Sequence, residues 1–441
     1  MSATGTAAKS RTFRRLLANT LVANVTTTFL SFALAFWVYL ETKSVLAASI
    51  VSGVSMLIGA ISGTIFGAVV DTHRKKTAMA LSSAITGVAF ATAGAVYVVA
   101  GERTSNWHGP WFWAFTGLIL VGSIAGQLRS IALSTTVTLL VPADRRDKAN
   151  GLVGTVNGVA HLLTSILSGL SVGLLGMGGT VAIAVVFTAV VLVDLLVSIH
   201  IDEPRPEGHY QARFDLRATW QTLRDVPGLL PLVLFSSFNN LVMGVFMALM
   251  DPYGLNLFSV ESWGVVLGIT SIGFIAGGAL VARFGLGRQP LRVLLVANVA
   301  IAIIGMGTAV REWQSLLVLG MFGFMLVIPI AEAAEQTILQ RLVPFQQQGR
   351  VFGVAQSIET ASTPIAAFII GPAAQFLLIP YMESAPGRST FGWLLGDGQA
   401  RGMALAFVVA SLLMLIVVLL AFLSTAYQRL NLRYAAEPVP A

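Results

Sequence analysis

The stretch LVPADRRDKANG at residues 140–151 returns later in the chain as LVPFQQQGRVFG at residues 342–353, without a gap and at an offset of 202 residues. A second repeated pair, Gly67-Ala68 and Gly278-Ala279, is offset by 211 residues. Both copies lie in very apolar sequence. A duplicated apolar unit of about 200 residues, repeated in the same sense, is how many secondary transporters are built.

The composition indicates an integral membrane protein. Of its 441 residues, 56% are hydrophobic and only 11% are charged, and the mean hydropathy is +0.81. A soluble domain carries about 25% charged residues. The chain has no cysteine, which excludes disulfides and thiolate metal sites. The apolar run at residues 16–40 is longer than the roughly 7–15-residue core of a signal peptide, so we expect a retained first helix.

Twelve apolar stretches are long enough to span a membrane, which takes roughly 20 residues. We expect them near residues 17–40, 45–70, 77–100, 111–139, 150–175, 180–200, 228–250, 262–284, 290–310, 313–339, 350–378 and 401–426. A polar stretch divides them six and six, so we expect a six-helix bundle at 1–200, a cytoplasmic linker at 201–227 and a six-helix bundle at 228–441. The expected fold is an all-α membrane protein of about 12 transmembrane helices in two pseudo-symmetric six-helix bundles. An axis along the membrane normal should relate the fourth helix to the tenth.

The distribution of positive charge predicts the orientation. With the N-terminus in the cytoplasm, 21 of the 27 Lys and Arg residues fall on the inner side, five on the outer side and one inside a helix. Such an excess marks the cytoplasmic side and faces the anionic lipids of the inner leaflet. We therefore expect a multi-pass protein of the cell inner (plasma) membrane with both termini in the cytoplasm, and no nucleic-acid partner for the net charge of +7.

The loop after the second expected helix reads GAVVDTHRKK at residues 67–76. Together with the six-plus-six arrangement, it resembles the G-x-x-x-D-R-x-G-R-R pattern of the major facilitator superfamily, with Thr72 in place of a base and Arg74 in place of a glycine. The resemblance implies a latch between the cytoplasmic ends of the two halves, formed by Gly67, Asp71, Arg74, Lys75 and Lys76. The second copy has Ala282 where the first has Asp71.

A second resemblance concerns the direction of transport. The loop at residues 141–151 is similar to that of a drug-exporter branch which includes macrolide efflux and enterobactin export proteins. This resemblance covers nearly the whole chain and implies drug:proton antiport by alternating access. The Gly-Pro pair expected in the fifth helix of antiporters is missing, and Gly371-Pro372 stands at the equivalent place in the eleventh.

Ionisable side chains inside membrane spans cost roughly 2.5–3.5 kcal/mol each on insertion scales, so each needs a reason. Five stand out within the expected spans: Arg129, Asp194, Glu332, Glu335 and Glu359. The repeat offset places Arg129 next to Glu332, and we expect these two to form a pair whose separation loads or releases a proton. Glu332 is the first proton-coupling candidate and Glu359 the next. A static buried ion pair that fixes helix packing is the alternative, and Asp194 is expected simply to reach water.

The first and seventh helices carry aromatic, amide and methionine side chains that suit an adaptable substrate cavity with a few polar anchors. The candidates are Phe29, Phe32, Phe36, Asn239, Asn240 and Met243. Such residues at helical spacing more often pack or face lipid, so we expect only some of them to line the cavity.

The sequence thus predicts a secondary active transporter and not an enzyme. It has no phosphate-binding loop for ATP, no clustered metal ligands and no sign of a cofactor. Intramembrane carboxylates favour protons as the driving ion, and the expected partners are a small-molecule substrate, protons and membrane lipids, with the chain as a monomer. The alternatives are a proton-coupled importer or symporter of a small metabolite and a non-transporting membrane sensor on the same fold. A membrane enzyme would need a nucleophile–base or metal constellation that we do not find.

Overall fold

The computed structural model describes residues 3–42, 45–201, 203, 220–221, 223–224, 226, 228–396 and 400–436, and every regular element in this part is helical. Most of the linker expected at 201–227 lies outside the described residues. The long helices are α1 (Ala3–Thr42), α2 (Val45–Thr72), α3 (Lys75–Ala100), α4 (Pro110–Leu140), α5 (Arg146–Val197), α7 (Leu229–Leu257), α8 (Val260–Phe284), α9 (Pro290–Thr308), α10 (Gln314–Leu342), α11 (Gln348–Ala373) and α14 (Ala400–Leu423). Short elements follow α11 and α14: a π-turn (Ala374–Leu378), α12 (Ile379–Glu383), α13 (Ala385–Leu395) and α15 (Thr425–Ala436).

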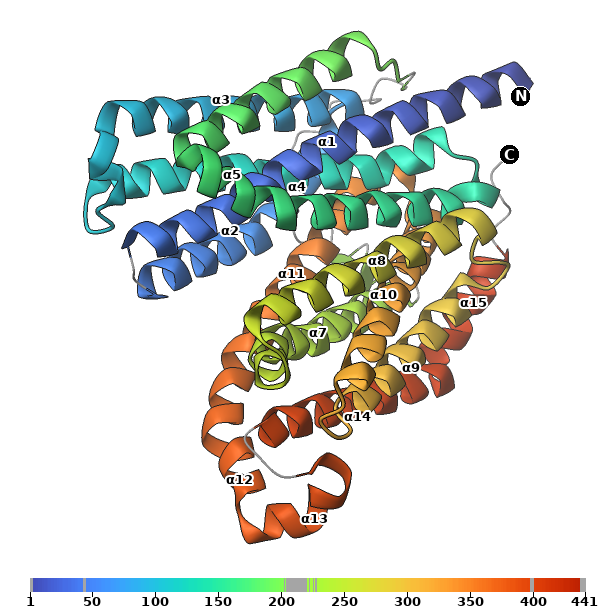
Figure 1. Ribbon diagram of the computed structural model, residues 1–441. Helices are drawn as coiled ribbons and strands as arrows, with labels where there is room; N and C mark the ends of the chain where they lie inside the picture. The colour runs from blue at the N-terminus through green and yellow to red at the C-terminus, as the bar shows by residue number, and fades with distance from the viewer. Residues whose placement is uncertain are drawn as a thin grey trace.

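The helices form two bundles, α1–α5 and α7–α14, which lie close together at one end and diverge toward the other (Figure 1). The loops at 72–75, 140–146 and 342–348 lie at the closed end, with the start of α1 and with α15 (Figure 1). We call this end the basic face, because Arg74, Arg145 and Arg350 lie there. The opposite end is the far face.

Helix α5 is two helices joined by a sharp turn at Gly176, whose backbone has φ 66° and ψ 178°. A positive φ of this kind is open to glycine and strained for most other residues. The hydroxyls of Ser171 and Thr180 lie 2.9 Å apart although nine residues separate them, so the chain doubles back here. The two arms of α5 therefore match the fifth and sixth spans expected from the sequence, at 150–175 and 180–200.

Eleven stretches of the described residues are long and apolar enough to cross a membrane, and the first arm of α5 is the remaining helix of the twelve. The predicted all-α membrane fold is confirmed. One difference lies at the far face, where the eleventh helix does not stop near residue 378. A π-turn after Pro372 carries it on into α12, and α13 then precedes the last span. Proline removes a backbone donor, and the helix accommodates that loss by a local change of winding.

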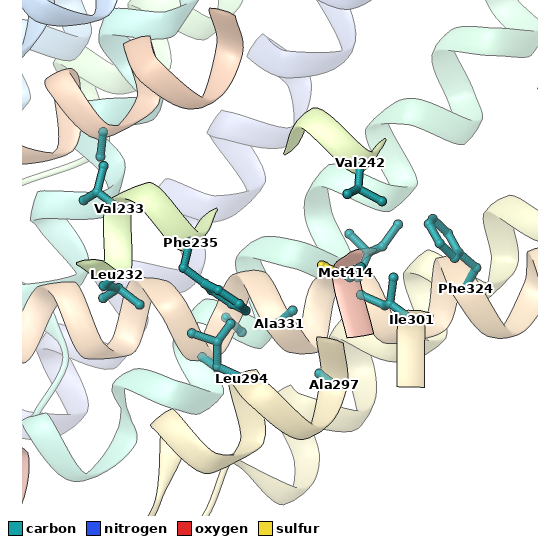
Figure 2. Packing of buried hydrophobic residues seen from close by; sticks show 14 of the residues in the cluster. Leu232, Val233, Phe235, Val242, Leu294, Ala297, Ile301, Phe324, Ala331 and Met414 are labelled. Carbon is teal, nitrogen blue, oxygen red and sulfur yellow. The ribbon is translucent and has the colours of Figure 1, made fainter. Parts of the chain in front are cut away.

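The core of the second bundle is apolar and closely packed. Side chains from α7, α9, α10 and α14 meet there, among them Val242, Ile301, Phe324 and Met414 (Figure 2). Each is at least nine-tenths buried. Because this interior leaves few voids, each helix keeps a fixed face toward the space between the bundles.

Candidate functional site

Two helix crossings join the bundles near the basic face, α2 with α11 and α8 with α5. At the first crossing, the place of a Cβ on Gly67 is filled by the carbonyl oxygen of Gly349. At the second, the place of a Cβ on Gly278 is filled by the backbone nitrogen of Thr155. Small residues let helix backbones approach this closely. The repeated Gly-Ala pair of the sequence thus lies at both crossings.

Asp71 ties α2 to the start of α11. Its carboxylate accepts hydrogen bonds from the backbone N–H groups of Gly349 (2.7 Å) and Arg350 (2.9 Å) and from the Arg350 Nε (3.2 Å). Only 2% of the Asp71 side chain is exposed. The first backbone N–H groups of a helix lack partners within the helix and carry its positive dipole end, so they suit a carboxylate.

The bases that follow Asp71 serve different purposes. Lys75 is buried, donates from Nζ to the Val70 carbonyl (2.9 Å) and lies over the ring of Phe345 at 5.0 Å. Its Nζ also lies 3.7 Å from Glu203, which accepts from the Lys75 backbone N–H at 2.6 Å. Burial raises the pKa of Glu203, and the bonds and charge of Lys75 partly oppose this.

The remaining motif residues lie at the surface of this crossing. Lys76 donates to the carbonyl of Leu196 near the end of α5 (3.0 Å), while Arg74 is exposed at the start of α3. Thr72, which stands where the family pattern has a base, donates its hydroxyl to its own helix at the Ala68 carbonyl (2.9 Å). The described contacts of Thr72 therefore stay within the first bundle.

The second crossing is fastened by a different acid. Asp147, in the first turn of α5, accepts from the backbone N–H of Leu286 just after α8, at 2.7 Å. Ala282, the counterpart of Asp71, packs its backbone against Gly151. Asp147 lies in the loop at residues 141–151 that resembles the drug-exporter branch, but sequence reasoning assigned it no role, because the latch pattern places its acid at the end of the second helix.

A polar seal of Arg146, Asn150, Thr337 and Gln340 lies between the crossings. Asn150 donates to Thr337 (2.9 Å) and Gln340 (3.0 Å), and Gln340 donates to the Ser134 carbonyl (3.0 Å). Arg146 donates to the Gln340 carbonyl at 3.2 Å. These buried bonds join α4 and α5 to α10 across the two bundles. Sequence reasoning missed the seal, since single amides in apolar helices show no pattern until their partners are known.

A cavity of about 300 Å³ lies directly beyond the seal, between the bundles. Helices α4, α5, α7, α10 and α11 line it. Its polar lining includes Glu332, Glu335, Gln336, Gln356, Glu359, Asn157 and Asn240. Lys, Arg and His are missing from its described lining. We call it the acidic cavity.

The three carboxyl groups of the acidic cavity come from two helices. Glu332 and Glu335 share one face of α10, as their spacing predicted, and Glu359 reaches in from α11. The Glu335 and Glu359 carboxyl groups lie within hydrogen-bonding reach of each other, and Ser236 of α7 lies within reach of Glu335. Two ionised carboxylates in contact repel, whereas one proton between them makes a hydrogen bond. The geometry suits the binding of a proton or a cation.

The expected pair of Arg129 with Glu332 is wrong. Arg129 is 2% exposed and points into the first bundle, where it donates to Ser83 (3.0 Å) and to the side-chain oxygen of Asn19. Asn19 in turn donates to Asp194 at 2.6 Å. Ser130 and Ile131, which follow Arg129 on α4, line the same cavity as Glu332, but α4 is rotated so that Arg129 itself points into the first bundle. Asp194 likewise belongs to this cluster and does not simply reach water.

The substrate-cavity candidates divide among three environments. Asn240 lines the acidic cavity, and Met243 lines a smaller apolar pocket nearby. Phe29 is buried in the core of the first bundle, and Phe32 packs edge-on against His161. Two further candidates, Asn239 and Phe36, are absent from the described cavity linings; Asn239 is half-buried and Phe36 exposed. The expectation that only some would line a cavity agrees with these positions.

Comparison with known proteins identifies the class. The sequence model of the Major Facilitator Superfamily matches residues 16–367. The chain therefore belongs to this family of membrane transporters, and it is a transporter and not an enzyme.

Individual relatives are more distant. Macrolide efflux protein A of Streptococcus pyogenes is 24% identical over 369 residues, which cover 80% of this chain and 87% of that protein. A bacterial homologue of the iron transporter ferroportin, solved in an outward-facing state, superposes with a TM-score of 0.66 at 15% identity, covering 94% of this chain and 100% of that one. The proton:xylose symporter XylE gives a TM-score of 0.63 at 14% identity, covering 93% and 96% of the two chains. Such identities to solved structures establish the shared fold alone.

Proposed function

We propose that this transporter is a proton-coupled exporter of amphipathic small molecules. The observation that carries the proposal is the acidic cavity, in which Glu332, Glu335 and Glu359 converge between the bundles without a basic side chain in the described lining. Such a site can hold a proton or a cationic group and disfavours anions. The similarity to a macrolide efflux protein supports outward transport.

The proposed orientation places both termini in the cytoplasm of a cell with this chain in its plasma membrane. The basic loops then face the cytoplasm, as the positive-inside rule requires. The closed basic face is in that case the cytoplasmic face, and the arrangement corresponds to an outward-facing state. Opening toward the cytoplasm would require both crossings and the polar seal to separate.

Coupling follows from competition for the carboxyl groups. A proton bound between Glu335 and Glu359 removes a negative charge from the acidic cavity, which weakens the attraction for a cationic substrate. Release of substrate to the outside and uptake of a proton would then accompany each other. Glu332, which is open to the cavity, is the group that both would meet first.

The test is substrate efflux from proteoliposomes with and without an imposed pH gradient, using a panel of dyes, macrolides and siderophores. Glu332→Gln should abolish uphill, proton-driven efflux while it allows downhill exchange, and Glu359→Gln should act in the same way. Glu383→Gln, an exposed acid at the far face, is the matched control and should transport normally.

Two results would overturn the proposal. If the Glu332→Gln and Glu359→Gln variants both still concentrate substrate in response to the pH gradient, the carboxyl groups are packing residues. If the gradient drives substrate in the same direction as protons, the chain is a symporter. Loss of all exchange in both variants would indicate damaged folding, which circular dichroism and the thermal unfolding midpoint would detect.

A further inference from the structure

A second pocket lies between α7, α9 and α10 in the far half of the second bundle. Its volume is about 60 Å³. Five methionines and two phenylalanines line it with Thr308: Met243, Met247, Met250, Met321, Met325, Phe246 and Phe324. The Thr308 hydroxyl donates to the Gly305 carbonyl at 2.8 Å, so its only proton is already used. We call this the methionine pocket.

The methionine pocket continues the wall of the acidic cavity. On α7, Asn240 lines the acidic cavity, and Met243, Met247 and Met250 follow on the same helix face. On α10, Glu332 lines the acidic cavity and Met325 the methionine pocket, seven residues apart. Seven residues of α-helix rise by about 10 Å.

The back of the methionine pocket is fixed, whereas its rim is adaptable. Phe246 packs against Phe324 at 5.0 Å between ring centres and stacks on Phe407 at 4.7 Å. The methionine side chains at the rim are unbranched and polarisable, so they can fit apolar groups of several shapes. Five of the chain's 13 methionines line this one pocket, which makes it the most methionine-rich of the described pockets.

We propose that the methionine pocket is a binding subsite for a small branched or linear alkyl group of the substrate, whose cationic group lies about 10 Å away in the acidic cavity. This inference rests on the proposed function and names the substrate class more closely. An apolar cavity of about 150 Å³ holds a benzene molecule, so the methionine pocket suits a group of only a few carbons. Its one hydroxyl has already donated its proton, so a polar group that enters would lose most of its hydrogen bonds to water.

The experiment measures equilibrium binding of two cations to the full chain in lipid nanodiscs, ethyltrimethylammonium and octyltrimethylammonium, with empty nanodiscs subtracted. Each methylene buried in an apolar site tightens binding by about fourfold. The octyl probe should therefore bind at least about tenfold more tightly than the ethyl probe once two methylenes enter the pocket. Met325→Trp, which fills the pocket from α10, should abolish this preference and leave binding of the ethyl probe unchanged.

Further variants separate the pocket from the acidic cavity. Met243→Trp fills the pocket from α7 and should likewise abolish the preference for the octyl probe. Agreement between the two filling variants would show that the loss does not come from a folding defect in one of them. Met325→Leu should keep most of the preference because it conserves volume. Met56→Trp, on an exposed site of α2, should change neither affinity. Glu332→Gln should weaken both probes equally and leave their ratio intact.

The inference fails if the octyl probe does not bind the unaltered chain, or if the preference survives both filling variants. A preference that persists while Glu332→Gln leaves both affinities unchanged would keep the methionine pocket and overturn the acidic cavity as the cation site. Equal binding of the two probes, weakened by Glu332→Gln, would overturn the methionine pocket and leave the proposed function standing.

Discussion

The two crossings that join the bundles use the same backbone geometry and opposite placements of charge. At α2–α11 the acid is Asp71 near the end of α2, and its partners are the N–H groups of Gly349 and Arg350. At α8–α5 the acid is Asp147, which stands 202 residues before Gly349, and its partner is the N–H of Leu286. In the first copy the acid lies on α2 and the amide groups on α11. In the second copy the acid lies on α5, the equivalent of α11, and the amide follows α8, the equivalent of α2.

A third carboxylate explains how the exchange is accommodated. Leu286 stands 211 residues after Lys75, so the two residues are equivalent in the repeat. The backbone N–H of Lys75 donates a hydrogen bond to the Glu203 carboxylate at 2.6 Å. In the first copy that amide is satisfied outside the crossing, which leaves the crossing to Asp71. In the second copy the equivalent amide is itself the link between the bundles. Duplicated helices thus keep their close packing while the polar contacts at their ends diverge.

The crossings also differ in strength. Asp71 accepts three hydrogen bonds, one of them from a guanidinium group, whereas the inter-bundle link of Asp147 is a single bond from a neutral amide. Hydrogen bonds to a charged group contribute about 1.5–3 kcal/mol and neutral ones about 0.5–1.5 kcal/mol, so the charge adds about 1 kcal/mol to each bond that either carboxylate accepts, and Asp71 accepts more of them. The α2–α11 crossing should therefore dominate the closed state of the basic face.

The largest effect is expected from Gly67→Ala, which places a Cβ where the carbonyl of Gly349 lies. Because that obstacle is backbone, α2 and α11 must separate, and substrate transport in proteoliposomes should fall more than about tenfold. The chain has no cysteine, so spin labels on Thr77→Cys and Gln346→Cys can report the separation of the bundles. The control is Gly53→Ala, where the added methyl meets open space. An unchanged label distance in Gly67→Ala would contradict the close crossing.

The next effect is expected from Asp71→Asn, which keeps the shape and removes the charge that the start of α11 binds. A loss of about 1.5–3 kcal/mol corresponds to a shift of about tenfold to a hundredfold away from the closed basic face. The same label pair should show a longer distance population, and transport should slow while expression is retained. Asp144→Asn is the control, since Asp144 is 64% exposed in a surface pair with Arg145. Equal turnover in both variants would mean that Asp71 has no role in closure.

Asp147→Asn should have a smaller effect, because the asparagine side-chain oxygen can still accept from the Leu286 N–H and only the charge contribution of one bond, about 1 kcal/mol, is lost. The closed population should fall by less than about tenfold, measured with labels on Arg145→Cys and Gln289→Cys across this crossing. If Asp147→Asn opened the basic face more than Asp71→Asn does, the ranking of the two crossings would be reversed.

The smallest effect concerns Glu203. Burial holds its pKa above the usual value, so the folded protein binds this proton more tightly than the unfolded chain does. Its contribution to stability is then greatest at low pH and declines as the pH rises through the raised pKa. Glu203→Gln should remove that part of the slope when the unfolding midpoint is measured from about pH 4 to about pH 8. The exposed Glu102→Gln should keep the slope, and an identical slope in both variants would exclude Glu203 as its source.

The sequence by itself determined the fold class and the helices, and it indicated where a candidate site should lie. Apolar runs longer than a bilayer requires must be helical there, because only helices and closed barrels satisfy their backbone in lipid. The duplication predicted two like bundles, and the cost of charge in lipid singled out Glu332, Glu335 and Glu359. These signals are local in the chain, or repeat at a fixed offset, so they can be read without coordinates.

Only the tertiary structure decided which polar groups meet. Arg129 points toward Asn19 and away from Glu332. Asp147 binds the Leu286 amide at the crossing where the second copy lacks an aspartate. Asn150 donates a hydrogen bond to Gln340 across the bundles. Each of these contacts depends on how a helix is rotated about its axis and on which helix lies beside it at that depth in the membrane. Successive residues of a helix point about 100° apart, so a small change in rotation directs a side chain toward a different neighbour. Helix rotation is fixed by packing over the whole bundle, which is why spacing along the chain could predict depth and not partners.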